Sequence, residues 1–328
     1  MESISVVRNE KKGLDTSYLV SHYATIATLL ILFIVFSIFV DKFFEFNNIM
    51  NIARQVSTLA IVAFGLTITM AAGDFDLSVG SIASLSGVVV AGLLANGSGM
   101  LVSIVAALAV GAGIGLLNGI VSTKVGIPSM IVTLGASSIA IGVNFMYTEG
   151  RAVYGGLPVP FTALGRGALF GIPSPIFIML VLGIVVFIFL NYTKPGRYIY
   201  ATGGNATAAK LSGIKTLKYR TIGLMFSGLG AGIAGIVLAA RLGSGQPTAG
   251  SSFLLDGLAA VFIGMTTIRI GQPNIIGTFV GVLLIGLLNN GLNLLGLPFY
   301  IQDIAKGLIM VIAVAFAASK NELKFFSS

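Results

Sequence analysis

Long apolar stretches separated by short polar ones run along almost the whole chain. Most of them approach the roughly 20 residues that a helix needs to cross a hydrocarbon core about 30 Å thick. The ten stretches cover residues 22–40, 52–72, 78–95, 101–122, 128–147, 174–191, 219–240, 253–267, 274–296 and 300–319. This pattern predicts an all-α, polytopic membrane protein with about ten transmembrane helices.

The composition supports this fold class and removes most kinds of chemistry. Of the 328 residues, 56% are hydrophobic and 9% are charged, which leaves too little polar surface to cover a soluble globule. With no cysteine and one histidine, the chain has neither thiolate ligands nor a multi-histidine site. We therefore expect no metal site, no catalytic residue and no enzymatic activity.

One polar segment is longer than the others, and it is basic. Between residues 191 and 220 the chain reads NYTKPGRYIYATGGNATAAKLSGIKTLKYR, without Asp or Glu. Its six cations are Lys194, Arg197, Lys210, Lys215, Lys218 and Arg220. Because cytoplasmic loops of membrane proteins are enriched in Lys and Arg, we expect this segment to lie in the cytoplasm.

Charge asymmetry over the rest of the chain gives the same orientation. With both termini inside, thirteen cations fall on the cytoplasmic side and five on the outer side. The expected organisation is a cytoplasmic tail at 1–21, one transmembrane domain at 22–319 with a cytoplasmic loop at 192–218, and a cytoplasmic tail at 320–328.

Two parts of the chain repeat the same order of polar and helix-breaking residues. The first contains Asp76, Asn118-Gly119, Pro128 and Gly135, and the second contains Asp256, Asn290-Gly291, Pro298 and Gly307. If the chain has ten helices, these parts are helices 2–5 and 7–10. Matching helices are then five apart in the chain, so they cross the membrane in opposite directions and the two copies are inverted. Inverted repeats with interrupted helices are typical of transporters, although common helix punctuation can also produce such a match by chance.

Four ordered motifs resemble a known family. They are GDFDLSVGSIASLSG (73–87), GAGIGLLNGIVSTKVGIPSMIVTLG (111–135), GRYIYATGGNATAAKLSGI (196–214) and LLDGLAAVFIG (254–264), within a likeness that extends over 48–318. They are similar to the permease subunits of bacterial ABC importers for ribose and related sugars, proteins of the cytoplasmic (inner) membrane. The resemblance implies ten helices and a dimer with an identical or sister permease. It also implies cytoplasmic ATPases that hold ATP and Mg²⁺, and an extracytoplasmic solute-binding protein.

ATP hydrolysis is not expected in this chain itself. The phosphate-binding GxxxxGK[ST] loop requires a Gly-Lys step, and the chain contains no Gly-Lys pair. If transport uses ATP, another polypeptide must hydrolyse it.

The basic segment contains a predicted short helix. Asn205 is a good N-cap, residues 206–212 include three alanines, and Gly213 can end the helix in a left-handed conformation, with Gly203-Gly204 as the preceding turn. The resemblance implies that this helix contacts the ATPase, whereas the residues alone equally allow a basic loop that faces lipid headgroups. The implied coupling residues are Gly196, Arg197, Gly203, Gly204, Asn205, Ala208, Ala209, Lys210, Ser212 and Gly213.

Three acidic residues lie at expected helix breaks. Asp74 and Asp76 precede the third helix, and Asp256 takes the matching place in the second repeat. Carboxylates in a membrane are costly and often functional, but an aspartate before a helix can also cap free N–H groups. Capping or structural pairing, gating and ion coupling therefore remain open for all three.

Uncharged amides are the candidates for the translocation path. Amides can exchange hydrogen bonds with a sugar's hydroxyl groups, but a buried amide can equally bond a neighbouring helix and hold the bundle together. The candidates are Asn118, Asn144, Asn289, Asn290 and Asn293.

The expected function is solute import as the permease of an ATP-driven importer, for a monosaccharide or a related polyhydroxylated solute. An ion-coupled secondary transporter is the first alternative, and it would use Asp74, Asp76, Asp303 or Lys306. Asp303 and Lys306 are otherwise expected to form a same-face helical pair. The second alternative is an importer of nucleosides or branched-chain amino acids.

Overall fold

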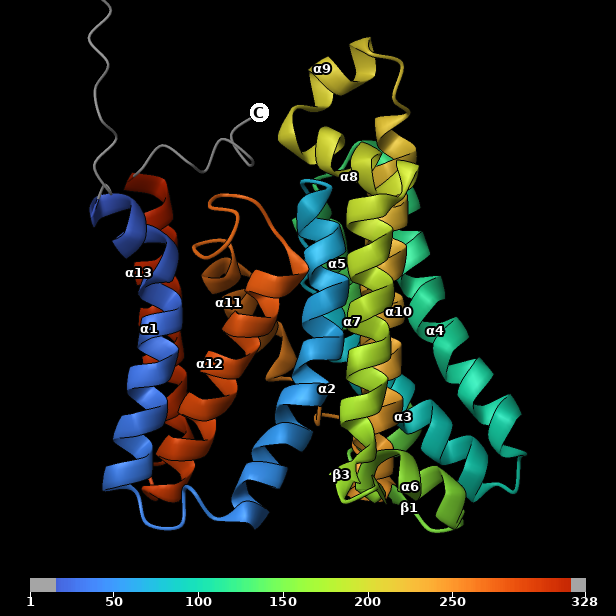
Figure 1. Ribbon diagram of the computed structural model, residues 1–328. Helices are drawn as coiled ribbons and strands as arrows, with labels where there is room; N and C mark the ends of the chain where they lie inside the picture. The colour runs from blue at the N-terminus through green and yellow to red at the C-terminus, as the bar shows by residue number, and fades with distance from the viewer. Residues whose placement is uncertain (1–15, 320–328) are drawn as a thin grey trace, which may run out of the picture.

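The computed structural model describes residues 16–319 and is built almost entirely of helices (Figure 1). In chain order these are α1 Thr16–Phe39, α2 Phe46–Ala71, α3 Val79–Ala95, α4 Met100–Ile120, the π-helical turn η1 Val121–Val125, α5 Ser129–Thr148, α6 Val159–Arg166, α7 Ser174–Tyr192, α8 Lys194–Gly204, α9 Ala206–Leu211, α10 Thr216–Leu242, α11 Phe253–Gly264, α12 Ile275–Leu294 and α13 Phe299–Ser319.

Each expected apolar stretch overlaps a helix of the described region, namely α1 to α5, α7 and α10 to α13. Six described helices are long and apolar enough to cross a membrane: α2, α4 continued by η1, α5, α7, α10 and α12. The protein is therefore an all-helical, polytopic membrane protein. The expected tails at 1–21 and 320–328 lie outside the described residues, except that α1 already begins at Thr16.

Four two-residue strands close loops at one end of the helices. β1, Val153–Tyr154, pairs antiparallel with β4, Ser244–Gly245, and so joins the segment after α5 to the segment after α10. β2, Ala168–Leu169, and β3, Ile172–Pro173, form a hairpin between α6 and α7.

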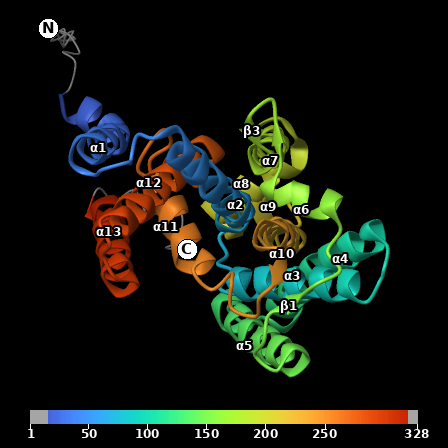
Figure 2. The ribbon, with the colours of Figure 1, turned by 90° about the horizontal axis from the view of Figure 1, so that it is seen from below.

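Two long helices, α2 and α10, pack against each other at the centre of the bundle (Figure 2). Around them the contacts fall into matching pairs: α10 packs on α4 and α3, while α2 packs on α12 and α11. Likewise α3 packs on α4 and α5, and α11 packs on α12 and α13. The two groups of four helices thus repeat one packing pattern.

Glycines allow the central helices to approach closely. A Cβ atom added at Gly115 of α4 would collide with the carbonyl oxygen of Leu224 in α10, and one at Gly228 of α10 would collide with the backbone of Gly111. Small residues at such crossings supply the packing that holds helices together where lipid removes the hydrophobic driving force.

The two ends of the bundle differ in shape. The start of α1, the end of α13, and the pair α8 and α9 lie at one end, where α9 extends beyond the long helices (Figure 1). The short strands and α6 lie at the opposite end.

We predict that Gly115→Ala destabilises the protein, because its methyl group must displace the backbone of α10. Overpacking of this kind costs about 1–3 kcal/mol in the free energy of unfolding. Gly113→Ala on the same helix is the matched control, since a Cβ at Gly113 meets no described atom within 4 Å. Unfolding of both variants in mixed micelles tests this, and equal stability would contradict the close packing of α4 on α10.

Candidate functional site

The basic segment forms two short helices that project from the end of α7. Thr193 caps α8, because its hydroxyl accepts a hydrogen bond of 3.2 Å from the N–H of Gly196. Gly196 is buried against the last turn of α7, where a side chain would collide with the carbonyl groups of Phe189 and Leu190. The start of α8 is therefore held tightly on the transmembrane bundle.

The predicted capping of the next helix is confirmed. The side chain of Asn205 accepts a hydrogen bond of 2.8 Å from the N–H of Ala208. Gly213 has a φ of +81°, and the N–H of Ile214 donates to the carbonyl of Ala209 at 3.0 Å, which closes the last turn of α9.

The expected turn at Gly203-Gly204 is wrong. Both glycines lie in α8, which continues until the N–H of Asn205 donates to the carbonyl of Ala201. The chain changes direction one residue later, at Asn205, whose backbone is extended. A local sequence rule favours a turn at two glycines, but here the helix continues through both, and Gly203 is buried against the loop at Gly73.

The outer surface of α9 is exposed and mostly small. Ala208, Lys210 and Ser212 are exposed, while Ala209 is buried beneath them. Leu211 is 85% exposed, and the sequence reasoning did not single it out. The sequence could have pointed to this leucine, because it is an apolar residue between Lys210 and Ser212 in a polar segment. An isolated exposed leucine at the tip of a projecting helix is suited to contact a partner.

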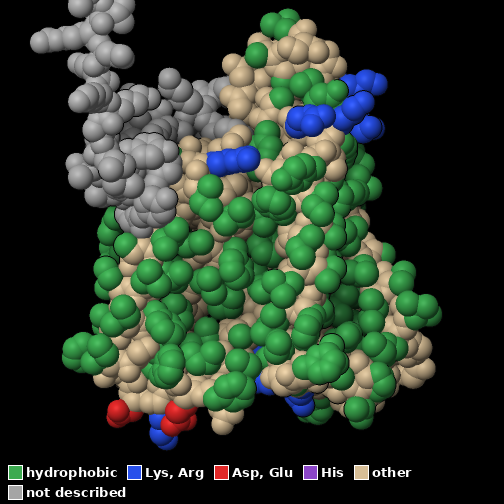
Figure 3. Space-filling view, viewed as in Figure 1, with side chains coloured by type: hydrophobic (Ala, Val, Ile, Leu, Met, Phe, Trp, Pro, Cys, Tyr) green, Lys and Arg blue, Asp and Glu red, His purple; other side chains and the backbone are tan. Residues whose placement is uncertain are grey.

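Positive charge gathers at this end of the molecule (Figure 3). Five of the six cations of the segment are exposed: Lys194, Arg197, Lys210, Lys215 and Lys218. The sixth, Arg220, points back into the bundle and forms an ion pair with Asp74.

A non-helical segment at 72–78, between α2 and α3, lies directly beneath α8. Gly73 has a φ of +87°, and a Cβ added to it would lie 3.2 Å from the Cα of Gly203. We call residues 72–78 the α2–α3 break. The buried end of α8 therefore rests on this break without intervening side chains.

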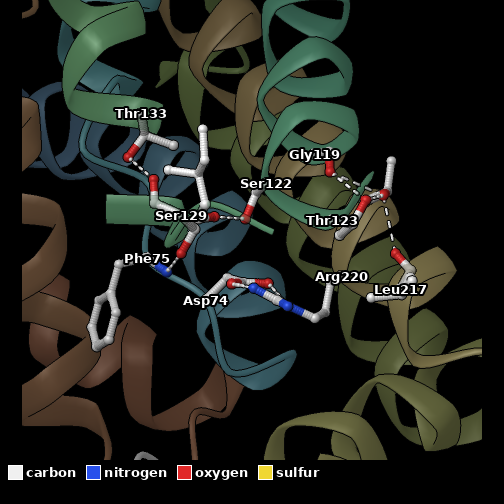
Figure 4. A network of polar contacts seen from close by, with 11 residues as sticks. Asp74, Phe75, Gly119, Ser122, Thr123, Ser129, Thr133, Leu217 and Arg220 are labelled. Atoms are coloured by element: carbon white, nitrogen blue, oxygen red, sulfur yellow. Dashed lines mark hydrogen bonds and ion pairs between the residues drawn. The ribbon is translucent and has the colours of Figure 1, made fainter. Parts of the chain in front are cut away.

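The ion pair between Asp74 and Arg220 connects the break to the start of α10 (Figure 4). The Arg220 Nη2 and Nε groups donate to the two carboxylate oxygens of Asp74 at 2.6 and 2.8 Å. The Asp74 side chain is 2% exposed and that of Arg220 is 29% exposed. Asp74 is thus structurally paired, one of the roles considered for it, with a partner that sequence spacing did not reveal.

The start of α5 supplies hydrogen-bond acceptors to the break. The backbone N–H of Phe75 donates to the hydroxyl of Ser129 at 3.2 Å, and that of Leu77 donates to the hydroxyl of Thr133 at 3.0 Å. Because backbone donors that are removed from water need protein partners, the two hydroxyl groups stabilise the interrupted helix.

Asp76 lies deeper and serves the start of α3. It is fully buried, and its Oδ1 accepts hydrogen bonds from the backbone N–H and the hydroxyl of Ser78 at 2.9 and 2.5 Å. The same hydroxyl accepts a bond of 3.1 Å from the amide of Asn118 in α4. Asp76 Oδ1 therefore satisfies the N–H of Ser78 just before α3, while its Oδ2 is buried without a hydrogen-bond partner among the described residues.

The second repeat places its aspartate in a comparable network. The Nζ atom of Lys306 in α13 lies 3.1 Å from Asp256 Oδ1, and Asn289 of α12 donates to Asp256 Oδ2 at 3.2 Å. Lys306 also pairs with Asp303 at 3.2 Å, which confirms the expected helical pair. Among the described residues, no three His, Cys, Asp or Glu side chains form a group that would hold a metal ion.

Tyr200 connects α8 to a second loop at the same end. Its hydroxyl donates to the carbonyl of Pro273, in the loop between α11 and α12, at 2.9 Å. Burial raises the pKa of Tyr200 to about 12, while nearby Arg269 acts in the opposite direction. The tyrosine is therefore a neutral donor at physiological pH and holds α8 against the second half of the bundle.

Comparison with known proteins identifies the family. Residues 48–314 match the family described as branched-chain amino acid transport system / permease component. The chain belongs to this permease family.

Individual relatives are sugar permeases. The chain is 41% identical to the ribose import permease protein RbsC of Escherichia coli K12 over 88% of this chain and 91% of RbsC. It is 38% identical to RbsC of Bacillus subtilis 168, over 96% and 98% of the two chains, and 34% identical to the L-arabinose transport system permease protein AraH of E. coli K12, over 92% of each. No solved structure matches the chain significantly. The resemblance to sugar-importer permeases is confirmed.

The five candidate path amides do not converge on one site in this permease. Asn290 and Asn48 exchange two hydrogen bonds of 2.9 Å, and Asn144 donates to the carbonyl of Pro247 at 2.9 Å. Asn293 is exposed near the end of α12. Asn118 contributes the polar side chain to an otherwise apolar cavity of about 600 Å³ between α3, α4 and α5. Four of the amides thus bond to other segments, and a role in the path stays a prediction.

We predict that Asp74 and Arg220 are energetically coupled. Asp74→Asn and Arg220→Gln should each destabilise the permease, because each leaves a partly or fully buried partner unpaired. In a double-mutant cycle the coupling should be about 1–3 kcal/mol in the free energy of unfolding. The exposed Lys218→Gln, combined with Asp74→Asn, is the control and should show no coupling. A coupling near zero between Asp74 and Arg220 would mean that the ion pair does not hold the break.

Proposed function

We propose that this permease is the transmembrane subunit of an ATP-binding-cassette importer that carries a monosaccharide, such as a ribose-like pentose. The substrate class is supported by relatives that are named as ribose, L-arabinose and D-allose permeases. In this role the chain contributes transmembrane helices and a translocation path for the solute, and it catalyses no chemical reaction.

In the proposed topology, ten helices span the membrane as two inverted repeats, with α2 to α5 matching α10 to α13 and α7 linking them. Support comes from the matching packing pairs around α2 and α10. The end that carries α8 and α9 is cytoplasmic, because the exposed lysines and arginines of the long basic segment gather there. Both termini then lie inside, and the domain at 22–319 is a single transmembrane unit.

The observation that carries the proposal is the projecting helix α9 on a firmly seated α8. Its exposed small side chains and Leu211 suit a cleft on a cytoplasmic ATPase, and the residues at 205–213 form the contact. Movement of α8 is transmitted to the α2–α3 break through Gly203 on Gly73. The break in turn moves with α10 through Asp74 and Arg220.

Three partners complete the proposed transporter. ATPase subunits bind ATP and Mg²⁺ on the cytoplasmic side, and a second permease chain, identical or a sister, forms the other wall of the path. An extracytoplasmic solute-binding protein delivers the sugar. Gating by the interrupted helices near Asp76 and Asp256 opens the path to one side at a time.

Three of the four membrane carboxylates argue against ion coupling as the energy source, the exception being Asp76, which bonds only Ser78. Asp74 is paired with Arg220, while Asp256 and Asp303 share Lys306. A carboxylate that is already neutralised by a protein cation is poorly suited to take up and release a coupling ion. ATP hydrolysis by a separate subunit is the better-supported source.

We predict that variants on the exposed surface of α9 uncouple the transporter. Leu211→Asp, Ala208→Arg and Gly213→Val should each reduce sugar-stimulated ATP hydrolysis and uptake by about tenfold or more, because an interface anchor contributes about 2 kcal/mol. The measurement is ATPase activity and uptake in proteoliposomes, with a panel of monosaccharides, nucleosides and branched-chain amino acids as stimulating solutes.

Gly97→Val is the matched control for Gly213→Val. Gly97 also has a φ of +81° and is exposed, but it lies in the loop between α3 and α4 at the opposite end. It therefore carries the same backbone strain without touching the proposed ATPase contact. Normal coupling in all three α9 variants would overturn the docking role, and stimulation only by a nucleoside or an amino acid would overturn the sugar assignment.

A further inference from the structure

The same pattern of residues recurs at the starts of α8 and α10. The chain reads KPGRY at 194–198 and KTLKY at 215–219. In each, a lysine is followed by a second cation three residues later and by a tyrosine in the next position. Because residues three and four positions apart are neighbours on a helix, each pattern places two cations beside one tyrosine.

The two patterns meet in the structure. The rings of Tyr198 and Tyr219 pack against each other, with their centroids 5.3 Å apart. Four cations therefore flank a single contact between α8 and α10, at the end of the bundle where Figure 3 shows lysine and arginine side chains gathered. They are Lys194, Arg197, Lys215 and Lys218, and all four are exposed. We call these cations and the two tyrosines the paired-tyrosine surface.

No carboxylate neutralises this surface in the part of the chain that the structure describes. The ion pairs there are formed by Arg220 and Lys306, neither of which belongs to the surface. Like charges at these spacings repel each other and destabilise a helix. An anion supplied by another molecule would therefore stabilise the starts of both α8 and α10.

The surface lies where membrane-crossing helices end. Lys194 follows Tyr192, the last residue of α7, by two positions, and Lys215 directly precedes α10. Both α7 and α10 are long and apolar enough to cross a membrane. The projecting helix α9 lies farther out, beyond the ends of the long helices (Figure 1). The four cations are therefore placed at the level of the lipid headgroups rather than at the tip of the projection.

The flank of α7 next to the surface is suited to lipid. Before Tyr192 its exposed side chains are apolar, and they include Leu180, Ile184 and Ile188, which are 48%, 58% and 48% exposed. This apolar strip leads to Tyr192, which is 70% exposed. Exposed tyrosines are typical of the boundary between hydrocarbon and headgroups, and clusters of Lys and Arg at the end of a membrane helix attract anionic lipids. A negatively charged phospholipid fits both features, whereas the acidic surface of a soluble partner fits only the charge.

We propose that the paired-tyrosine surface binds the phosphate group of an anionic phospholipid, such as phosphatidylglycerol. The phosphate oxygens accept hydrogen bonds from Arg197 and from the lysines, and the acyl chains lie along the apolar flank of α7. The bound lipid holds α8 against the start of α10, next to Arg220 and its ion pair with Asp74. Arg197 then contacts lipid rather than the ATPase. This inference goes beyond the proposed function and does not depend on which solute is carried or on how transport is driven.

The test measures the dissociation constants of phosphatidylglycerol and phosphatidylcholine from the purified full-length permease in detergent micelles, by native mass spectrometry at increasing lipid concentration. The wild type should bind phosphatidylglycerol about tenfold or more tightly than phosphatidylcholine, because several cations act on one phosphate. Arg197→Gln and Lys218→Gln, one from each pattern, should each weaken phosphatidylglycerol binding about fivefold, which is the contribution of one cation near an anionic headgroup.

Matched controls come from the opposite end of the bundle. Arg151→Gln and Lys42→Gln change exposed cations in the loops between α5 and β1 and between α1 and α2 (Figure 1). Phosphatidylglycerol binding by these two variants should stay within about twofold of the wild type, because neither residue belongs to the paired-tyrosine surface.

A second pair of variants distinguishes a built site from diffuse attraction. Tyr198→Ala leaves all four cations in place but removes the ring contact that aligns the two patterns. It should weaken phosphatidylglycerol binding about threefold or more, since an aromatic pair of this kind contributes about that factor. Tyr198→Phe keeps the ring contact and should bind like the wild type.

Three outcomes would contradict the proposal. Equal affinity of the wild type for the two lipids, or unchanged binding in Arg197→Gln and Lys218→Gln, means that the surface is not a lipid site. Normal binding by Tyr198→Ala means that the cations attract lipid only diffusely. If the charge variants keep phosphatidylglycerol but lose the ATPase subunit during purification of the complex, the surface belongs to the ATPase. Gel filtration and thermal melting in detergent establish that each variant is folded, and the α9 variants test the importer role separately.

Discussion

The need to satisfy polar groups inside the membrane governs this structure, and the α2–α3 break is where it acts most strongly. Interrupting a helix there exposes backbone N–H groups and places two aspartates in the bundle. Asp74 and Asp76 are buried, so the protein itself must provide partners for these groups. Ser129 and Thr133 accept from the backbone, while Arg220 neutralises Asp74. Each of these contacts comes from a helix distant in sequence, which is why one short segment draws several helices together.

The same contacts place the break at the junction of several helices. It lies under α8, beside the start of α10 and against the start of α5. Glycines at the central crossings make the bundle a set of closely packed rigid helices, in which motion is transmitted by whole helices rather than absorbed by side chains.

The two ends of the central helices solve the same electrostatic problem differently. At the end that carries α8 and α9, the arginine and the acid belong to one chain, and the pair is closed. At the opposite end the arginines Arg54, Arg166 and Arg241 face a cavity, and the residue after the terminal glycine of α10 is a serine.

The sequence alone determined the fold class, the positions of the ten apolar helices and the capped helix at 206–211, because hydrophobic length and the chemistry of Asn205 and Gly213 are local properties. It did not reveal that Gly203 and Gly204 end a helix, that Asp74 pairs with Arg220, or that Lys306 reaches Asp256. The path amides also looked alike in sequence, although most of them bond to particular neighbours. Only the tertiary structure decided these points, since a buried polar group takes whichever partner the packing of distant helices brings within reach.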